Sequence, residues 1–144
     1  MHGFLYVVSV CCLVSCWAAP LATGAATPTI ALDRLIACLE MQEATPWSSR
    51  GGGLQFTKAT WGDFSPDPYS WASQPDKARQ IARKALLQAI QRMERAGIKP
   101  SVWLLALRWN CGYEGMLRRM HRPWEYAEHV NNLYHDHDFL RTRL

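Results

Sequence analysis

One carboxylate in the sequence is placed where it could act as an acid toward a ligand. Glu43 ends a segment whose apolar residues recur at the spacing of one helical face: Leu32, Leu35, Ile36 and Leu39. At about 100° of rotation per residue, this stripe continues onto Glu43, whereas Glu40 lies about 60° further round. A charged carboxylate on the buried side of a helix is unfavourable unless it is paired, and a protonated one can serve as a general acid. The alternative is that Glu43 turns into solvent at a frayed helix end.

The segment that follows Glu43 favours a loop and a close approach of backbone to a ligand. Pro46 ends the expected helix, and the three consecutive glycines of residues 51–53 permit positive φ angles. Residues 54–56 then predict a short strand or the entry to a short helix over residues 58–64. We therefore expect Glu43 at the edge of a cleft with a glycine-rich far wall, although a plain turn would explain the glycines equally well.

The N-terminal segment has the character of an export signal. An apolar run covers residues 4–19, and small residues follow it. We interpret residues 1–25 as a signal peptide and residues 26–144 as the mature domain, which would be periplasmic or extracellular. Cys16 ends a Leu-Val-Ser-Cys run similar to a bacterial lipobox, so a lipoprotein signal is a second interpretation, with lipid anchoring at Cys16. An uncleaved membrane anchor is the third, and each of these carries the domain out of the cytoplasm.

The composition indicates one packed domain. The chain has 144 residues, of which 49% are hydrophobic and seven are Trp, enough for a small core in a domain of about 115 residues. Its net charge is +4, and all sixteen Lys and Arg lie at or after Arg34. This modest positive charge suits an anionic polymer and falls short of the charge typical of nucleic-acid-binding domains. We therefore expect no nucleic-acid partner, and a monomer.

The hydrophobic periodicity predicts a mainly α domain of about five helices. We expect these helices over residues 30–43, 58–64, 75–96, 101–110 and 124–134. Residues 102–109 are apolar nearly all round, so this helix should be buried at the centre, with Gly112 stopping it. Ser73 and Asp76 have capping-box spacing at the start of the third helix. At most a small β element is expected near residues 52–56.

Two aromatic residues and two cysteines have roles that the sequence leaves open. Tyr69 and Trp71 lie in a Pro-rich loop, where they would either stack on a sugar face or pack in the core. Cys38 and Cys111 remain after signal removal, and in an oxidising compartment they would either form one disulfide or stay as free thiols. No metal or cofactor site is indicated.

Several of these motifs, taken in order, are similar to a known superfamily. Residues 52–61, GGLQFTKATW, resemble the G-G-L-Q-F run and following T-W of the resuscitation-promoting factors. Residues 106–112, ALRWNCG, resemble the A-x-Y-N-x-G run of soluble lytic transglycosylase domains, with Trp for Tyr. Residues 123–130 loosely match the terminal segment of these domains, with His129 where a Tyr often stands. The resemblance to the lysozyme-like superfamily, an α+β fold, spans roughly residues 32–134.

The resemblance implies a site that cuts the β-1,4 bond between N-acetylmuramic acid and N-acetylglucosamine in peptidoglycan glycan strands. Glu43 would be the catalytic acid, Gln55 would line the cleft wall and Asn110 would face the cleft. The other expected substrate contacts are Gly53, Leu54, Phe56, Tyr69, Trp71, Trp109 and Tyr126. Ala44 departs from the Ser or Thr that usually follows the acid, and the loop from Glu43 to the Gly-Gly-Leu-Gln run is short. Both departures bear on substrate preference.

The distribution of carboxylates predicts a mechanism with a single Glu. Residues 44–62 contain no Asp or Glu, and Asp63 and Asp67 come after the expected strand. The N-acetyl group of the substrate would then assist at C1, and the muramyl 6-hydroxyl would close a 1,6-anhydro ring, as in lytic transglycosylases. The alternatives are a lysozyme-type hydrolase that uses water placed by Asp63 or backbone groups, and a catalytically silent peptidoglycan-binding module.

Overall fold

The computed structural model describes residues 29–44 and 52–136. The expected signal of residues 1–25, with Cys16, lies outside the described residues, as does most of the loop after Glu43. Within the described part of the chain, no helix is both long and apolar enough to cross a membrane.

The described residues form five α-helices and two short 3₁₀ turns. The helices are α1 (Leu32–Glu43), α2 (Lys58–Phe64), α3 (Pro75–Arg95), α4 (Val102–Arg119) and α5 (Glu125–His135), and the turns are η1 (Gly52–Leu54) and η2 (Tyr69–Ser73). The mainly α prediction is confirmed. The described residues contain no strand, and the β element considered near residues 52–56 is replaced by η1. Gln55 follows that turn with a φ of 48°, a left-handed conformation that no strand residue adopts.

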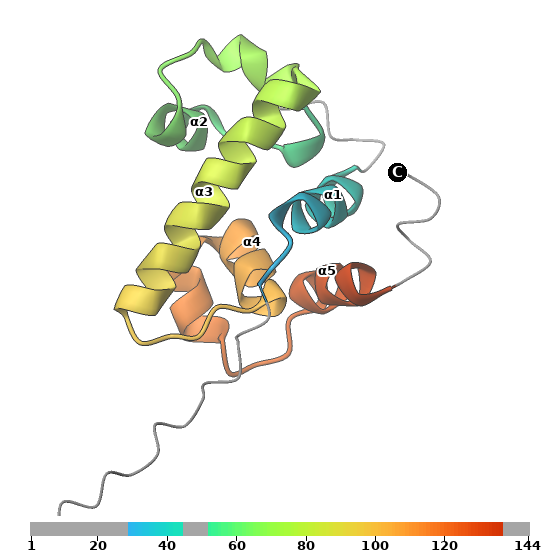
Figure 1. The fold of residues 1–144 in the computed structure, drawn as a ribbon, viewed down its shortest axis with the longest axis vertical. Coiled ribbons are helices and arrows are strands. Elements are labelled where there is room, and N and C mark those ends of the chain that lie inside the picture. Colours follow the sequence, from blue (N-terminus) through green and yellow to red (C-terminus); the bar gives the residue numbers. More distant parts are fainter. Residues whose placement is uncertain (1–28, 45–51, 137–144) are drawn as a thin grey trace, which may run out of the picture.

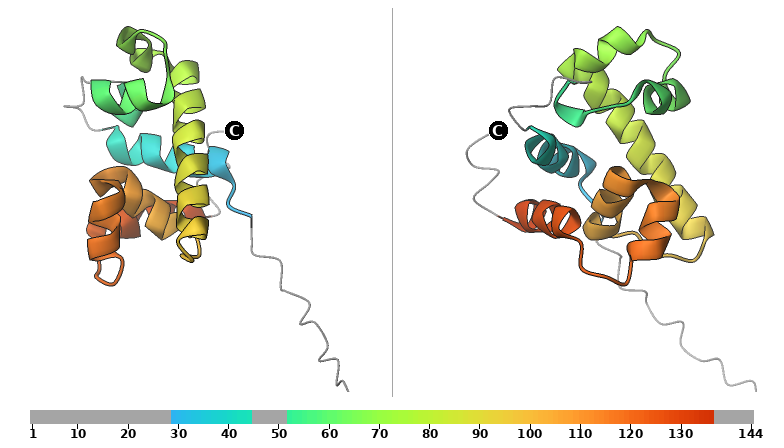
Figure 2. Two further views of the ribbon diagram at one scale, coloured as in Figure 1. Left: turned by 90° about the vertical axis from the view of Figure 1, so that its left-hand side faces the viewer. Right: turned by 180° about the vertical axis from the view of Figure 1, so that it is seen from behind.

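The helices are arranged around the crossing of α1 and α3. Figure 1 shows α3 running the length of the molecule, with α1 crossing it midway and α5 on the other side of α1. The turns η1 and η2 and helix α2 gather at the N-terminal end of α3, and α4 lies toward its C-terminal end, packed against α5 (Figure 2). The C-terminal end of α1, with Glu43, therefore points toward η1.

All five helices contribute side chains to the hydrophobic core. Leu35, Cys38 and Leu39 of α1 have no exposed surface, and the same holds for the three consecutive residues Leu105, Ala106 and Leu107 of α4. Trp103, Leu104 and Trp109 keep partial exposure, so α4 is not buried all round as its sequence suggested. The indole side chains of α4 instead reach the surface and the cavity described below.

The sequence predicted both ends of helix α3, but its N-terminal cap differs from the prediction. Pro75 occupies the first turn, as expected, but the N-cap is Gln74 and makes no side-chain cap. The capping box of Ser73 and Asp76 was wrong, because the Ser73 hydroxyl donates to the Ser70 carbonyl inside η2. At the other end Gly97 has a φ of 69°, and the amides after the helix close a Schellman motif through Ile98 N–H to the Met93 carbonyl.

Helix α4 is longer than predicted and is kinked where it was expected to stop. Gly112 has φ 74° and ψ 175°, which interrupts the helical geometry, but the chain resumes the helix as far as Arg119. The resumed turn packs closely on the preceding one, because a Cβ at Gly115 would lie 2.9 Å from the Cβ and Sγ of Cys111. A glycine with positive φ here redirects the helix without ending it.

Candidate active site

A cavity of about 410 Å³ lies where the end of α1, η1, α2, α3 and the middle of α4 meet. Its lining residues are Glu43, Leu54, Gln55, Phe56, Thr57, Thr60, Phe64, Ala85, Arg108, Trp109, Asn110 and Gly112. The fold thus brings the expected acid Glu43 to the same cavity as the expected wall and the Trp-Asn pair of α4. Among the described residues, Glu43 is the only carboxylate that lines it, and residues 45–51 contain no Asp or Glu in sequence.

Glu43 is held by a phenol from the far end of the chain. The Tyr126 hydroxyl, at the start of α5, donates to Glu43 Oε1 at 2.5 Å. Burial, followed by the hydrogen bond to Glu43 and its negative charge, raises the pKa of Tyr126 well above its usual range. Tyr126 therefore stays a neutral donor at every working pH. Glu43 is half-buried and anchored, which disfavours the alternative of a frayed side chain in solvent.

Gln55 connects the cavity wall to the helix that carries the acid. Its side-chain amide Nε2 donates to the backbone carbonyl of Glu43 at 2.8 Å. This bond satisfies one of the carbonyl groups left open at the end of α1. Gln55 lines the cavity as expected, and part of its side chain is used to fix the position of Glu43.

The aromatic side of the cavity is held by ring contacts and one hydrogen bond. The Phe56 ring packs edge-on against Trp61 and Trp109, with ring centroids 5.7 and 5.4 Å away. The Tyr69 hydroxyl donates to the Phe56 carbonyl at 2.6 Å, so Tyr69 supports the cavity wall from outside. Leu54, Phe56 and Trp109 line the cavity, as expected.

Four expected contacts are not part of the cavity lining: Gly53, Tyr69, Trp71 and Tyr126, whose hydroxyl donates to Glu43 as described above. Gly53 is exposed beside it, and Tyr69 makes the bond to Phe56 described above. Trp71 lies under the ammonium group of Lys77, 5.0 Å from the ring centroid. Neither aromatic side chain of the 65–75 loop presents a face to the cavity.

Asn110 lies at the exposed edge of the cavity. Its Oδ1 accepts a hydrogen bond from the indole N–H of Trp124 at 3.1 Å. The bond orients the amide, so its NH₂ group remains as the donor available to a ligand. Asn110 and Glu43 are therefore both hydrogen-bonded to residues at the start of α5, which the order of the motifs along the chain could not show.

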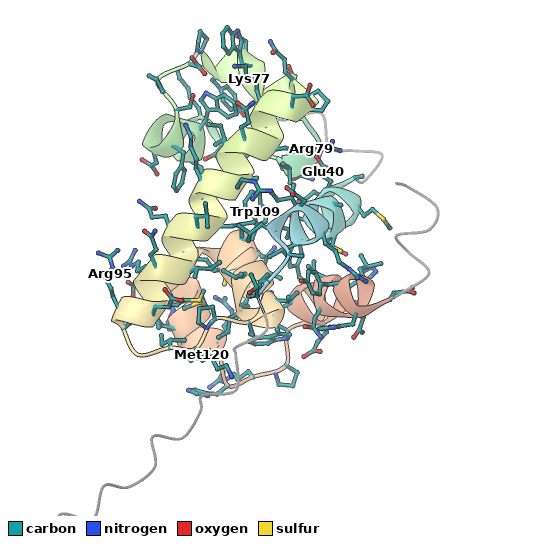
Figure 3. All side chains as sticks on the ribbon, in the orientation of Figure 1. Glu40, Lys77, Arg79, Arg95, Trp109 and Met120 are labelled. Carbon is teal, nitrogen blue, oxygen red and sulfur yellow. The ribbon has the colours of Figure 1, made fainter. Side chains whose placement is uncertain are left out.

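Glu40 has a different partner from Glu43. Its two carboxylate oxygens accept from Arg79 Nε and Nη2 of α3, at 2.8 and 2.9 Å. Figure 3 shows the two side chains meeting between α1 and α3. This ion pair lies outside the cavity lining, which agrees with the expected position of Glu40 on the flank of the helix.

Cys38 and Cys111 are both free thiols in the structure. Burial raises the pKa of Cys38 to about 11, against the opposing charge of Arg34. The Cys111 thiol donates to the Leu107 carbonyl one turn earlier, at 3.0 Å. The disulfide considered from sequence is not formed, so both residues contribute to packing.

Arg108 is a cavity residue to which the sequence analysis assigned no role. It was visible inside the Trp-Asn motif as the one charged residue of an otherwise apolar helical stretch, residues 102–109. Burial, with a further contribution from the like charge of Arg92, lowers the pKa of Arg108 below its usual range. Thr57, Thr60, Phe64, Ala85 and Gly112 complete the lining.

The residues gathered at the cavity indicate which chemistry the site can perform. Comparison with protein-family models, curated proteins and solved structures finds no match for the chain. Among the described residues, no cluster of three His, Cys, Asp or Glu could hold a metal ion. The cavity offers one anchored carboxyl group, an oriented amide, an aromatic wall and one cation. Such a set suits proton transfer to a polar, uncharged or anionic ligand of sugar size.

Proposed function

We propose that the protein cleaves the β-1,4 bond between N-acetylmuramic acid and N-acetylglucosamine in peptidoglycan, as a lytic transglycosylase with Glu43 as its only acid. The observation that carries this proposal is the pairing of Glu43 with Tyr126 at the cavity. A neutral phenol fixes one carboxyl oxygen in place, which leaves the other oxygen to transfer a proton. The resemblance of the Gly-Gly-Leu-Gln-Phe and Trp-Asn motifs supplies the substrate class.

The reaction needs one proton carrier that acts twice. Glu43 first donates its proton to the bridging oxygen as the bond from that oxygen to C1 breaks, while the substrate's own N-acetyl oxygen bonds to C1. The Glu43 carboxylate then takes the proton of the muramyl 6-hydroxyl. That hydroxyl oxygen attacks C1, the N-acetyl oxygen leaves, and the 1,6-anhydro ring closes. Glu43 ends the cycle protonated, and no water is consumed.

The positions of the other carboxylates support this single-acid mechanism. A two-carboxylate glycosidase needs a second acid on the opposite face of the scissile bond. Asp63 is exposed on α2, and Asp67 uses its backbone carbonyl to accept from the Trp61 indole at 2.8 Å. Neither lines the cavity. Asn110 would orient an N-acetyl group, and Trp109 with Phe56 would contact the apolar face of the sugar.

The test is the chemistry of the released products. Purified peptidoglycan is incubated with the protein, and the soluble muropeptides are identified by mass spectrometry. The proposal predicts 1,6-anhydromuramyl ends, which are 18 Da lighter than reducing ends because water is not added. Reducing ends would show a hydrolase instead. Binding to the polymer with no soluble product would show a silent binding module.

A further inference from the structure

The cavity contains a cation, Arg108, that has no anionic partner in the described part of the chain. Arg108 of α4 lines the cavity, and its Nε atom is buried without a hydrogen bond. Among the described residues, its guanidinium also makes no ion pair and no cation–π contact. Glu43, the one carboxylate that lines the cavity in the described part of the chain, has its Oε1 engaged by Tyr126 and forms no salt bridge with Arg108. A desolvated guanidinium without an anion is unfavourable. A ligand that brings a negative group to Arg108 would therefore bind favourably in this cavity.

The neighbouring charges do not compensate Arg108. Arg92 of α3 acts on it with a charge of the same sign, and this effect is larger than the opposing effect of the Cys111 thiol. Arg92 itself is placed over the Tyr113 ring, 3.6 Å from the centroid, and its Nη2 lies 3.9 Å from Glu114. The rest of the lining is apolar, hydroxyl or amide apart from Glu43. The cavity therefore favours a ligand that carries a negative group beside neutral hydroxyl and amide groups.

The shape of the cation indicates which anion fits. A guanidinium presents paired N–H donors that match the two oxygens of a carboxylate. Of the two sugars in the proposed substrate, only N-acetylmuramic acid bears an acid, on its lactyl ether. That carboxylate is free when the strand carries no peptide, and it is an uncharged amide when the peptide is attached. The other carboxylates of the polymer lie further out, on the peptide itself.

We propose that Arg108 binds the free lactyl carboxylate of an N-acetylmuramic acid unit, so that the cavity prefers glycan strands whose peptides have been removed. This inference rests on the proposed function, because the substrate class comes from it. Arg108 is then a specificity-determining residue, and Glu43 remains the catalytic one. The preferred substrate would have to be supplied by an amide hydrolase that separates the peptide from the lactyl group.

The test is a binding comparison in the Glu43→Gln background, where turnover does not disturb the measurement. Three tetrasaccharides are compared by calorimetry: one of alternating N-acetylglucosamine and N-acetylmuramic acid with free lactyl carboxylates, the same one with those groups as N-methylamides, and a neutral N-acetylglucosamine tetramer. A fourth ligand carries the peptides on the lactyl groups. A charge-assisted pair predicts roughly tenfold tighter binding of the free carboxylate than of its methylamide.

Variants at position 108 assign the effect to this side chain. Arg108→Gln should remove the tenfold preference, and Arg108→Lys should keep part of it, because lysine retains the charge and loses the paired geometry. Arg118→Gln is the matched control, since Arg118 is exposed on the same helix and does not line the cavity. It should leave the preference unchanged. The comparison of ligands on the protein with Arg108 intact does not depend on how any variant at position 108 folds.

Each outcome separates this inference from the proposed function. Equal affinity for the carboxylate and the methylamide would overturn the role of Arg108 and leave the proposed function standing. An Arg108-dependent preference for the peptide-bearing ligand would place the bound carboxylate on the peptide and overturn the lactyl assignment. Failure to bind any of the saccharides would contradict the proposed function itself.

Discussion

Replacing Tyr126 with phenylalanine removes one hydrogen bond from the site and little else. The hydroxyl donates to Glu43 Oε1 at 2.5 Å, and the ring, which phenylalanine keeps, packs against the core. A hydrogen bond to a charged group contributes about 1.5–3 kcal/mol. If that contribution is needed in the transition state, where the carboxyl group gives up its proton and becomes charged, the rate falls roughly 10- to 150-fold. Loss of the acid itself should cost a larger factor, about 10²–10⁴.

The assay is the initial rate of product release from a soluble glycan substrate, with the turnover number and KM determined separately. We expect Tyr126→Phe to lower the turnover number within that range and to change KM little. Tyr134→Phe is the matched control, because Tyr134 lies on the same helix and its hydroxyl accepts from Ala31 N–H, away from the cavity. It should keep the wild-type rate. An unchanged turnover number for folded Tyr126→Phe would refute the positioning of Glu43 by Tyr126.

Two further predictions concern stability. The fold raises the pKa of Tyr126 above its unfolded value, mainly by burial and then through Glu43, so the unfolded state loses this proton first as pH rises. This contribution to stability is fully present below pH ~10 and falls by about 1.4 kcal/mol per pH unit above it. Denaturant unfolding between pH 9 and 11 should therefore show that the free energy of unfolding falls less steeply with pH for Tyr126→Phe than for wild type. Equal slopes of this free energy against pH would contradict the expected burial of the phenol. Gly115→Ala should destabilise the protein by about 1–3 kcal/mol, because the new Cβ would lie 2.9 Å from Cys111. At Gly62 an added Cβ would meet no atom within 4 Å, so Gly62→Ala should be neutral or stabilise α2 by up to about 1 kcal/mol. Equal melting temperatures for the two variants would contradict the close packing of Gly115 on Cys111.

Local sequence patterns were enough to predict that five helices form and how the two glutamates are oriented, but not the full length of α4. Helix α2 has the bounds that the sequence suggested, and α1 ends at Glu43 as expected. The rotation per residue separated Glu43 from Glu40, and the structure gives them different partners, Tyr126 and Arg79. These features depend on residues within a few turns of one another, which is the range that a helical pattern describes.

The sequence could not predict features that depend on contacts between distant segments. Tyr126 is 83 residues from Glu43, and nothing in its local spacing indicated a bond to that carboxylate. Gly112 was expected to stop α4, but whether a glycine ends a helix or only redirects it depends on the packing of the turn beyond, here Gly115 on Cys111. Arg108 was visible as a lone charge on an apolar helix, and only the fold places it in the cavity, with no hydrogen bond from its Nε to any residue that the structure describes.

The central claim is that Glu43 is the single acid of a glycan-cleaving site, and a pair of variants tests it most directly. Glu43→Gln keeps the size of the side chain and removes its proton transfer, whereas Glu40→Gln alters a partly exposed carboxylate that pairs with Arg79 outside the cavity. Both are incubated with peptidoglycan, and anhydromuramyl products are quantified by mass spectrometry beside wild type. The account predicts near-wild-type product from Glu40→Gln and a loss of about 10²-fold or more from Glu43→Gln, with both variants folded. Anhydromuramyl product from Glu43→Gln at the wild-type rate would contradict it.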